Sequence, residues 1–378
     1  MLECDKKRTA QGSQVAPTGE SIVNPVHRTA LELRLVIGTI SVLVVGLVVG
    51  STALAQDSIG ATIYGKANVS VMNFDDDSTS IWELSSNASR LGFKGATHLG
   101  GSLEAIYKLE FEVFFDDGLD DKDAGNVFQQ RNIYVGLQGR AGTLFLAKHD
   151  SALKMAQLKV DRFNDLPAGD IKSVLIGENR LSNIINYTTP RFGGLSGTIQ
   201  LVLNEGDDIF GDGSKADGLT DSISSALNWQ NEHFNLALAY DKDVVSSGIA
   251  GDETKIPFNS VRITGQAVFE YFELGVIFER SKDSWKGAGH RQQSTDGYVV
   301  SGALKSGNWK VYAQLSRSDM PIKYEMTDQN SQAAIGVDYN LAKPTKLFVY
   351  YSKLKWEDNL TAADQRDSVF ALGFEHKF

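Results

Sequence analysis

Short segments with an apolar side chain at every second position recur through this chain, and they limit its fold more than any other feature. In 369–378 one face holds Phe370, Leu372, Phe374, His376 and Phe378. A period of two with one apolar face predicts a β-strand. The segment 61–71 repeats the pattern, with Ile63 and Val69 on its apolar face and Lys66 on the other.

The same pattern predicts sixteen strands along the chain. They cover 61–71, 88–97, 102–113, 129–138, 143–149, 183–189, 195–203, 221–230, 234–242, 259–270, 273–281, 296–306, 309–318, 332–341, 346–356 and 367–378. Their connections alternate in length, because short turns such as 99–101 and 307–308 come between long polar loops such as 149–182 and 204–220. This pattern predicts an all-β fold, a sixteen-stranded antiparallel transmembrane β-barrel with short periplasmic turns and long outer loops.

A membrane location is predicted from two requirements: backbone polar groups must be hydrogen-bonded, and the polar strand faces must meet water. Beyond position 56, no apolar stretch approaches the length of a membrane-spanning helix. In hydrocarbon every backbone N–H and C=O must be paired internally, so strands cross a membrane as a closed barrel. The polar strand faces then need water, and a sixteen-stranded bore is too wide for side chains to fill. A soluble β-protein is the alternative, but nothing would require its connections to alternate so regularly.

The N-terminal region predicts a leader that is removed from the mature chain. Arg34 precedes an apolar run over 35–50, and the run ends in the small-residue cleavage pattern at 53–55. We therefore predict a signal peptide in 1–55, with cleavage after Ala55, and a barrel domain over 56–378. The alternative is a membrane anchor, since the run is nearly long enough to span a bilayer. Cys4 lies in this leader, so the mature chain has no thiol for disulfides, metal sites or nucleophilic catalysis.

The charge balance argues against nucleic-acid binding. The predicted leader holds four acidic and five basic residues, which leaves 43 acidic and 32 basic residues in the mature chain, a net charge near −11. Histidines are not paired at metal-ligand spacing, and the motifs of common hydrolases and nucleotide-binding enzymes are absent. We therefore predict no catalytic residues, no metal site and no cofactor. We interpret the acidic run 75–77 as solvated charge on a loop. The alternative is that it binds divalent cations that bridge lipopolysaccharide.

Several stretches, in order along the chain, carry a resemblance to a known family. They are 61–66, 89–95, 131–137 and the terminal Phe378. Together they resemble the sixteen-stranded general porins of Gram-negative outer membranes. The resemblance implies a homotrimer in the bacterial outer membrane, surrounded by lipid and lipopolysaccharide. It also implies a water-filled channel for passive diffusion of small hydrophilic solutes and ions.

In that family one long loop folds into the bore and narrows it. The matching loop is 149–182, and the resemblance implies that its carboxylates face basic residues on the barrel wall across a transverse field. The expected constriction residues are the acidic Asp161, Asp165, Asp170 and Glu178 and the basic Arg90, Lys94, Arg131 and Lys148. Arg90 and Lys94 lie on the polar face of their strand, whereas the faces of Arg131 and Lys148 stay open. The alternative is that these are solvated loop charges.

The last strand is similar to the signal that the outer-membrane barrel-assembly machinery recognises by strand addition. Phe378 and Phe374 carry this expectation, while His376 stands where the family often has another aromatic residue.

The acidic excess of the mature chain and the loop carboxylates together predict a weak preference for cations. Two other functions stay open, an adhesin or receptor that acts through the long loops, and a barrel enzyme. The sequence offers no evident catalytic pair for an enzyme, so we predict that the protein is not one.

Overall fold

The computed structural model describes residues 60–116, 127–246, 256–322, 326–357 and 365–378, with side chains left out at 320–328. The predicted leader and its cleavage site lie outside these residues, so both stay predictions. Among the described residues, no helix is long and apolar enough to cross a membrane.

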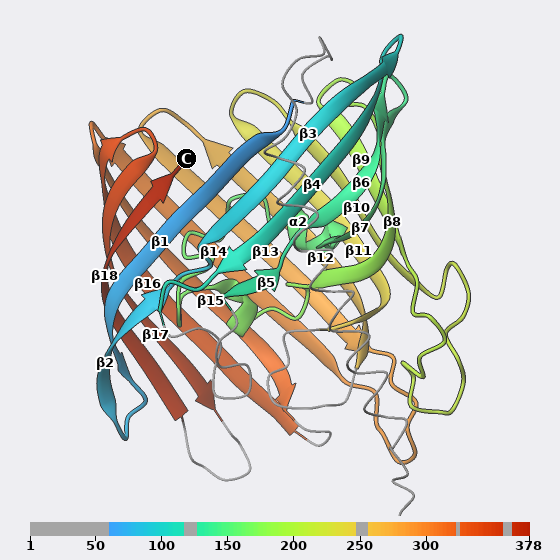
Figure 1. Cartoon of the computed structure of the whole chain (residues 1–378). Helices are drawn as coiled ribbons and strands as arrows, with labels where there is room; N and C mark the ends of the chain where they lie inside the picture. Colours follow the sequence, from blue (N-terminus) through green and yellow to red (C-terminus); the bar gives the residue numbers. More distant parts are fainter. Residues whose placement is uncertain (1–59, 117–126, 247–255, 323–325, 358–364) are drawn as a thin grey trace, which may run out of the picture. The chain divides into compact units, whose positions relative to one another are not determined.

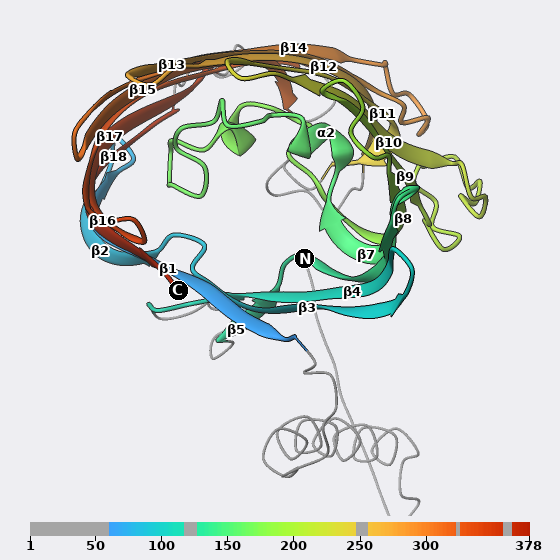
Figure 2. The same cartoon turned by 90° about the horizontal axis from the view of Figure 1, so that it is seen from above.

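The described strands form one antiparallel sheet that closes on itself (Figures 1 and 2). The strands are β1 Thr62–Asp75, β2 Ser80–Ser86, β3 Arg90–Gly100, β4 Leu103–Val113, β5 Phe128–Gln130, β6 Ile133–Gly139, β7 Gly142–Asp150, β8 Arg180–Thr188, β9 Leu195–Val202, β10 Ser222–Gln230, β11 Phe234–Val245, β12 Pro257–Val268, β13 Phe272–Asp283, β14 Ser294–Ser306, β15 Trp309–Ile322, β16 Met326–Ala342, β17 Thr345–Glu357 and β18 Gln365–Lys377. Neighbours in the chain pair with each other, and β18 pairs with β1. Closure leaves no free sheet edge, as a barrel in a membrane requires.

The predicted sixteen-stranded barrel is confirmed, although the sheet has eighteen strand segments. Both β2 and β3 pair with β1, and both β5 and β6 pair with β4, so two barrel strands are broken in the middle. The first break is at 87–89, where the Asn87 backbone N–H bonds the Asn68 carbonyl and Ala88 has a positive φ of 47°. The predicted start at 88 misses β2, because this segment has no clean alternation.

The alternating pattern also underestimates how far strands run beyond the apolar band. The polar residues 319–331, predicted as a loop, belong largely to β15 and β16, whose backbones stay paired from Trp309–Tyr339 to Ile322–Met326. Strands outside the hydrocarbon need no apolar face, so hydrophobic periodicity cannot reveal their ends.

Strands with clear alternation turn their apolar face outward. On β17, Phe348 and Tyr350 point inward and are at most 2% exposed, whereas Val349 and Tyr351 point outward and are 38% and 46% exposed. On β12, the inward Arg262 is fully buried and the outward Ile263 is 53% exposed. An apolar outer surface with a polar interior is the reverse of a soluble protein, and it suits lipid outside and water within.

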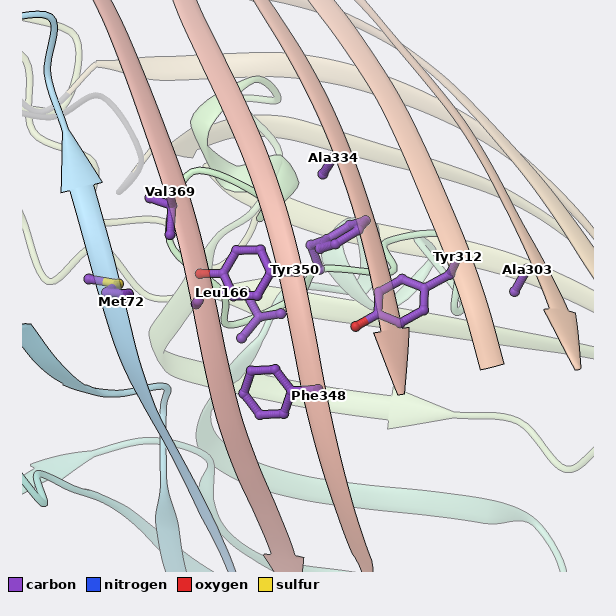
Figure 3. Packing of buried hydrophobic residues seen from close by; sticks show 10 residues of the cluster. Met72, Leu166, Ala303, Tyr312, Ala334, Phe348, Tyr350 and Val369 are labelled. Carbon is purple, nitrogen blue, oxygen red and sulfur yellow. The ribbon is translucent and has the colours of Figure 1, made fainter. Parts of the chain in front are cut away.

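The connection between β7 and β8 folds into the barrel instead of standing outside it (Figure 2). We call residues 151–179 the constriction loop. It contains α2 Ala152–Met155 and the 3-10 helix η1 Ile171–Ser173. Its apolar side chains pack against one side of the barrel wall, where Phe163 and Leu166 meet Tyr312, Phe348 and Tyr350 (Figure 3). The loop and this side of the wall therefore share an apolar core inside the bore.

Polar side chains of the same wall bond the loop backbone. Hydroxyl groups of Ser301 and Ser318 each donate to a loop carbonyl at 2.6 Å, that of Val160 and that of Val174 respectively. The Gln332 side-chain amide donates to the carbonyls of Ala168 and Asp170, at 3.1 and 3.0 Å. Buried backbone groups need partners, so these bonds fix the loop to this side of the wall.

Candidate channel constriction

An opening lies beside the constriction loop, along the side of β2 to β5. This opening has a volume of about 570 Å³. Its charged lining consists of five cations, Arg90, Arg131, Lys154, Lys172 and Arg180, and four carboxylates, Glu112, Asp150, Asp165 and Asp170. The loop thus lies inside the barrel beside this opening, while its role in narrowing the channel stays a prediction.

Asp165, near the tip of the loop, meets three cations of the opposite wall. Its Oδ2 lies 2.6 Å from Arg90 Nη2 and 3.0 Å from Lys66 Nζ, and its Oδ1 lies 3.8 Å from Arg131 Nη2. We call these three cations the basic wall cluster. Although burial alone would raise the pKa of Asp165, the three positive charges lower it to about 2. The loop tip therefore carries a permanent negative charge that is neutralised by the wall.

Carboxylates of the wall form ion pairs with two of the arginines that line the opening. Arg131 Nη1 donates to Glu112 at 2.6 Å, and its Nε lies 3.5 Å from Glu110. Arg180 Nε lies 3.0 Å from the Asp150 carboxylate. In this narrow opening most charges are therefore held in pairs.

The three other predicted loop carboxylates do not face the basic wall cluster. Asp161 accepts the backbone N–H groups of Phe163 and Ile171, at 3.0 and 3.3 Å. Asp170 caps η1 by accepting from the Lys172 N–H at 2.8 Å. The expectation of a row of acidic residues across from basic ones is thus corrected, because the loop uses these oxygens to hold its own fold.

Burial shifts the pKa of two of these loop residues upward. It raises the pKa of Asp161 well above the usual value, and the nearby Asp170 and Glu178 add to this effect. Burial also raises the pKa of Glu178, against the attraction of Arg262. These two carboxyl groups therefore ionise less readily than exposed ones.

The basic residues predicted for the wall divide into three places. Arg90 and Arg131 belong to the cluster around Asp165. Lys94 lies on the inward face of β3, but its ammonium stands 5.2 Å from the Tyr64 ring centroid, beside its cross-strand partner Lys108. Lys148 lines a groove with Leu109, Val135 and Leu146, which are outward apolar residues. The wall role of Lys148 is corrected, because β7 alternates outward at 144, 146 and 148.

Sequence reasoning missed four cations of the opening and its surroundings, which are Lys66, Lys154, Lys172 and Arg180. Alternation in 61–71 did place Lys66 on the polar face, so its inward direction was open to prediction. The other three lie in or next to the constriction loop, where no periodic pattern indicates direction.

Both ends of the constriction loop are held by one buried arginine on β12. Arg262 donates to the Leu153 carbonyl at 3.2 Å and to Glu178 at 2.7 Å. Its Nε also donates to Glu279 at 2.8 Å, and Glu279 accepts the Gly177 N–H at 3.0 Å. Residues 153 and 177–178 are thus fixed to the same point of the wall, which defines where the loop enters and leaves the bore.

Phe374 and Phe378 lie on the outward face of the last strand, 42% and 60% exposed. The His376 ring stacks between them, 6.4 Å from each ring centroid. Their outward direction is as predicted, while their role in assembly stays a prediction. Among the described residues, no group of three or more His, Cys, Asp or Glu side chains is placed to hold a metal ion.

A family model described as Gram-negative porin matches residues 39–359. The chain belongs to this family. The porin is therefore a protein of the Gram-negative outer membrane, and its family and closed barrel point to a channel rather than an enzyme. Outer membrane porin protein 32 of Delftia acidovorans is 26% identical over 354 residues, covering 87% of this chain and 93% of that protein. An outer membrane porin protein of Bordetella pertussis is 23% identical, covering 89% and 99%.

Solved structures show the same fold. An anion-selective porin from Comamonas acidovorans superposes with a TM-score of 0.69 at 21% identity, covering 84% of this porin and 99% of that chain. The trimer form of OmpT, an outer membrane protein of Vibrio cholerae, gives a TM-score of 0.59 at 13% identity, covering 84% and 99%.

Proposed function

We propose that this porin is a diffusion channel for small hydrophilic solutes that passes anions more readily than cations. One observation carries the preference: the opening beside the constriction loop is lined by more cations than carboxylates, although the chain as a whole is acidic. Ions respond to the charges within about a Debye length of their path, and distant loop charge is screened by salt. The charges that line the opening therefore affect ion selectivity more than the net charge of the chain does.

The state of the loop charges supports the same direction. Asp165 is surrounded by three cations, and Asp161 and Asp170 are engaged by backbone N–H groups. Lys172, in contrast, is exposed and forms no ion pair within the described part of the chain. The expected weak cation preference rested on the acidic excess of the mature chain and on these loop carboxylates. Because neither ground describes the lining of the opening, we propose the opposite sign. The related porin from Comamonas acidovorans is anion-selective, which agrees with this direction.

Transport in this proposal is passive and needs no tight capture. Paired charges on both sides of the opening orient water and dipolar solutes, and the width of the opening limits size. No solute is singled out by these features, so the channel is general within its size limit.

Assembly follows the family in the proposal. A signal peptide in 1–55 directs secretion, the last strand with Phe374 and Phe378 is recognised by the barrel-assembly machinery, and three copies associate among outer-membrane lipid and lipopolysaccharide. The trimer form of the Vibrio cholerae neighbour supports the association. Cross-linking in native outer membranes tests it, since a trimer gives a ladder that stops at three copies.

Planar bilayers test the channel and its preference together. The purified porin should give stepwise openings, and a potassium chloride gradient should give a reversal potential of the sign set by chloride. Absence of steps would contradict the channel, whereas steps with a reversal potential of the potassium sign would contradict only the anion preference.

A further inference from the structure

A second cavity lies between the constriction loop and the wall on the side of the short turns. We call it the turn-side pocket. It has a volume of about 280 Å³ and is lined by Lys159, Asp161, Arg162, Glu273, Lys310, Tyr312, Asp338 and Lys346. Lys310 and Lys346 are the second residues of β15 and β17, next to the short turns before these strands. The pocket shares no lining residue with the opening beside β2 to β5, so it is a separate place on the path through the bore.

Positive charge exceeds negative charge around this pocket. Arg162, Lys305 and Lys310 form ion pairs with Glu273, and within the described residues all the ion pairs of these three cations go to that one carboxylate. One negative charge cannot neutralise three positive charges. The lining itself holds four cations and three carboxylates, so it carries an excess of one positive charge.

The remaining carboxylates of the lining are already engaged. Asp338 accepts from Lys346 Nζ at 2.9 Å and from the Tyr312 hydroxyl at 2.9 Å. Asp161 accepts two backbone N–H groups of the loop. Because hydrogen-bond donors already contact both carboxylates, each repels a nearby anion less than an unpaired carboxylate would.

Two donors at the pocket lack partners. The Arg162 side chain is 4% exposed, and its Nη2 is buried without a hydrogen-bond partner among the described residues. Its other nitrogens are used, as Nη1 bonds Glu273 and Nε lies 3.4 Å from the Ser301 hydroxyl. Lys159 is exposed and forms no ion pair within the described residues. A buried guanidinium N–H without an acceptor is costly, so it indicates that an acceptor from outside the chain belongs there.

We propose that the turn-side pocket binds a small divalent oxyanion, held by Arg162 and Lys159 with Lys310 and Lys346 beside it. Each tetrahedral oxyanion or short dicarboxylate offers several charged oxygen acceptors to this set of donors. A water molecule occupies about 30 Å³ of liquid, so the pocket has room for such an anion and several waters. The inference rests on the proposed anion preference. It adds a site on the permeation path at which divalent anions bind transiently.

Competition with chloride current tests the proposal on the intact porin. Sulfate added at constant ionic strength should reduce the chloride conductance of single channels and saturate, whereas nitrate, a monovalent anion, should not. In the Lys159→Gln, Lys346→Gln double variant, the sulfate concentration for half the effect should rise roughly tenfold, from the loss of charge-assisted donors. Phosphate and succinate, measured in the same way, show whether the site prefers a tetrahedral oxyanion or a dicarboxylate.

Lys282→Gln is the matched control, because it removes one exposed outward lysine of β13. It should leave the sulfate effect unchanged. If the double variant does not migrate as a folded trimer, Lys159→Gln alone carries the test, since this side chain is exposed on the loop. A sulfate effect that is absent in the wild type, or equal in wild type and variant, overturns the pocket. The reversal potential of the same channels then shows whether the anion preference survives without it.

Discussion

Asp165 of the constriction loop and Arg90 of β3 lie 75 positions apart in the chain, yet their charged atoms are 2.6 Å apart across the bore. This contact joins the tip of the loop to the wall opposite its anchored side. It limits the opening and neutralises part of the basic wall cluster. The Asp165 carboxylate therefore affects both the net charge of the opening and the position of the loop tip.

Asp165→Asn should make the channel more anion-selective. The change removes the negative charge that Lys66, Arg90 and Arg131 share and leaves their positive charges facing the opening. The reversal potential in a potassium chloride gradient should move further toward the chloride limit. Lys148→Gln is a suitable control, because Lys148 lines the outward groove. An unchanged or reversed shift would show that these cations do not reach the permeating ions.

Acid should weaken the attachment of the loop tip. The pKa of Asp165 is lowered from 3.8 to about 2 in the folded protein. A lowered acid pKa stabilises the fold above the unfolded value and loses that effect as pH falls. The contribution, about 2 kcal/mol at neutral pH, should therefore disappear between pH 3.8 and pH 2. Single-channel noise should rise over this window in the wild type, and Asp165→Asn should show the noise at neutral pH.

Arg262→Gln should loosen the constriction loop while the barrel stays assembled. It leaves Glu178 and Glu279 without their fully buried partner, and breaking such a cluster costs roughly 3–5 kcal/mol. We expect brief closures in single-channel records and faster protease cleavage between 151 and 179. Heat-modifiable migration on gels checks that the barrel is intact. Channels without brief closures, together with a loop that resists protease, would contradict this prediction. They would mean that the wall contacts of Ser301, Ser318 and Gln332 are enough to hold the loop in place.

Lys172→Glu should move the selectivity toward cations. This side chain is exposed in the opening and has no described ion pair, so the new charge is not cancelled by a partner. The reversal potential measures the shift, and Lys172→Gln should give an intermediate value. If Lys172→Glu matched the wild type, the loop edge would lie too far from the path of the ions to affect them.

Phe378→Ala should lower the amount of folded porin in the outer membrane more than Phe370→Ala does. Both side chains point outward from the last strand, but Phe378 also closes the barrel, where its N–H and carbonyl bond Gly65 and its ring covers the space beside that glycine. Immunoblots of outer-membrane fractions measure the outcome. Equal losses from the two variants would remove the special role of the last residue.

Strand alternation and connection length were enough to predict the closed sixteen-stranded barrel, and the family resemblance pointed to the loop that narrows it. Alternation also placed Arg90 correctly on an inward face. It could not predict that Arg90 and Arg131 would meet Asp165 while Lys148 faced outward. On β7 the consecutive apolar residues Leu144, Phe145 and Leu146 show no alternation from which the face of Lys148 could be predicted.

The sequence by itself determined the barrel, because a period of two decides which face of each strand meets lipid and which meets water. The tertiary structure alone decided the charge of the opening. The constriction loop has no period, so alternation cannot give the direction of its carboxylates. Asp161 and Asp170 bond N–H groups of the loop itself, Glu178 bonds Arg262 of β12, and Asp165 meets the basic wall cluster. Asp161, Asp170 and Glu178 are therefore acidic in sequence but serve the fold of the loop, while Asp165 and Lys172 remain to act on the passing ions.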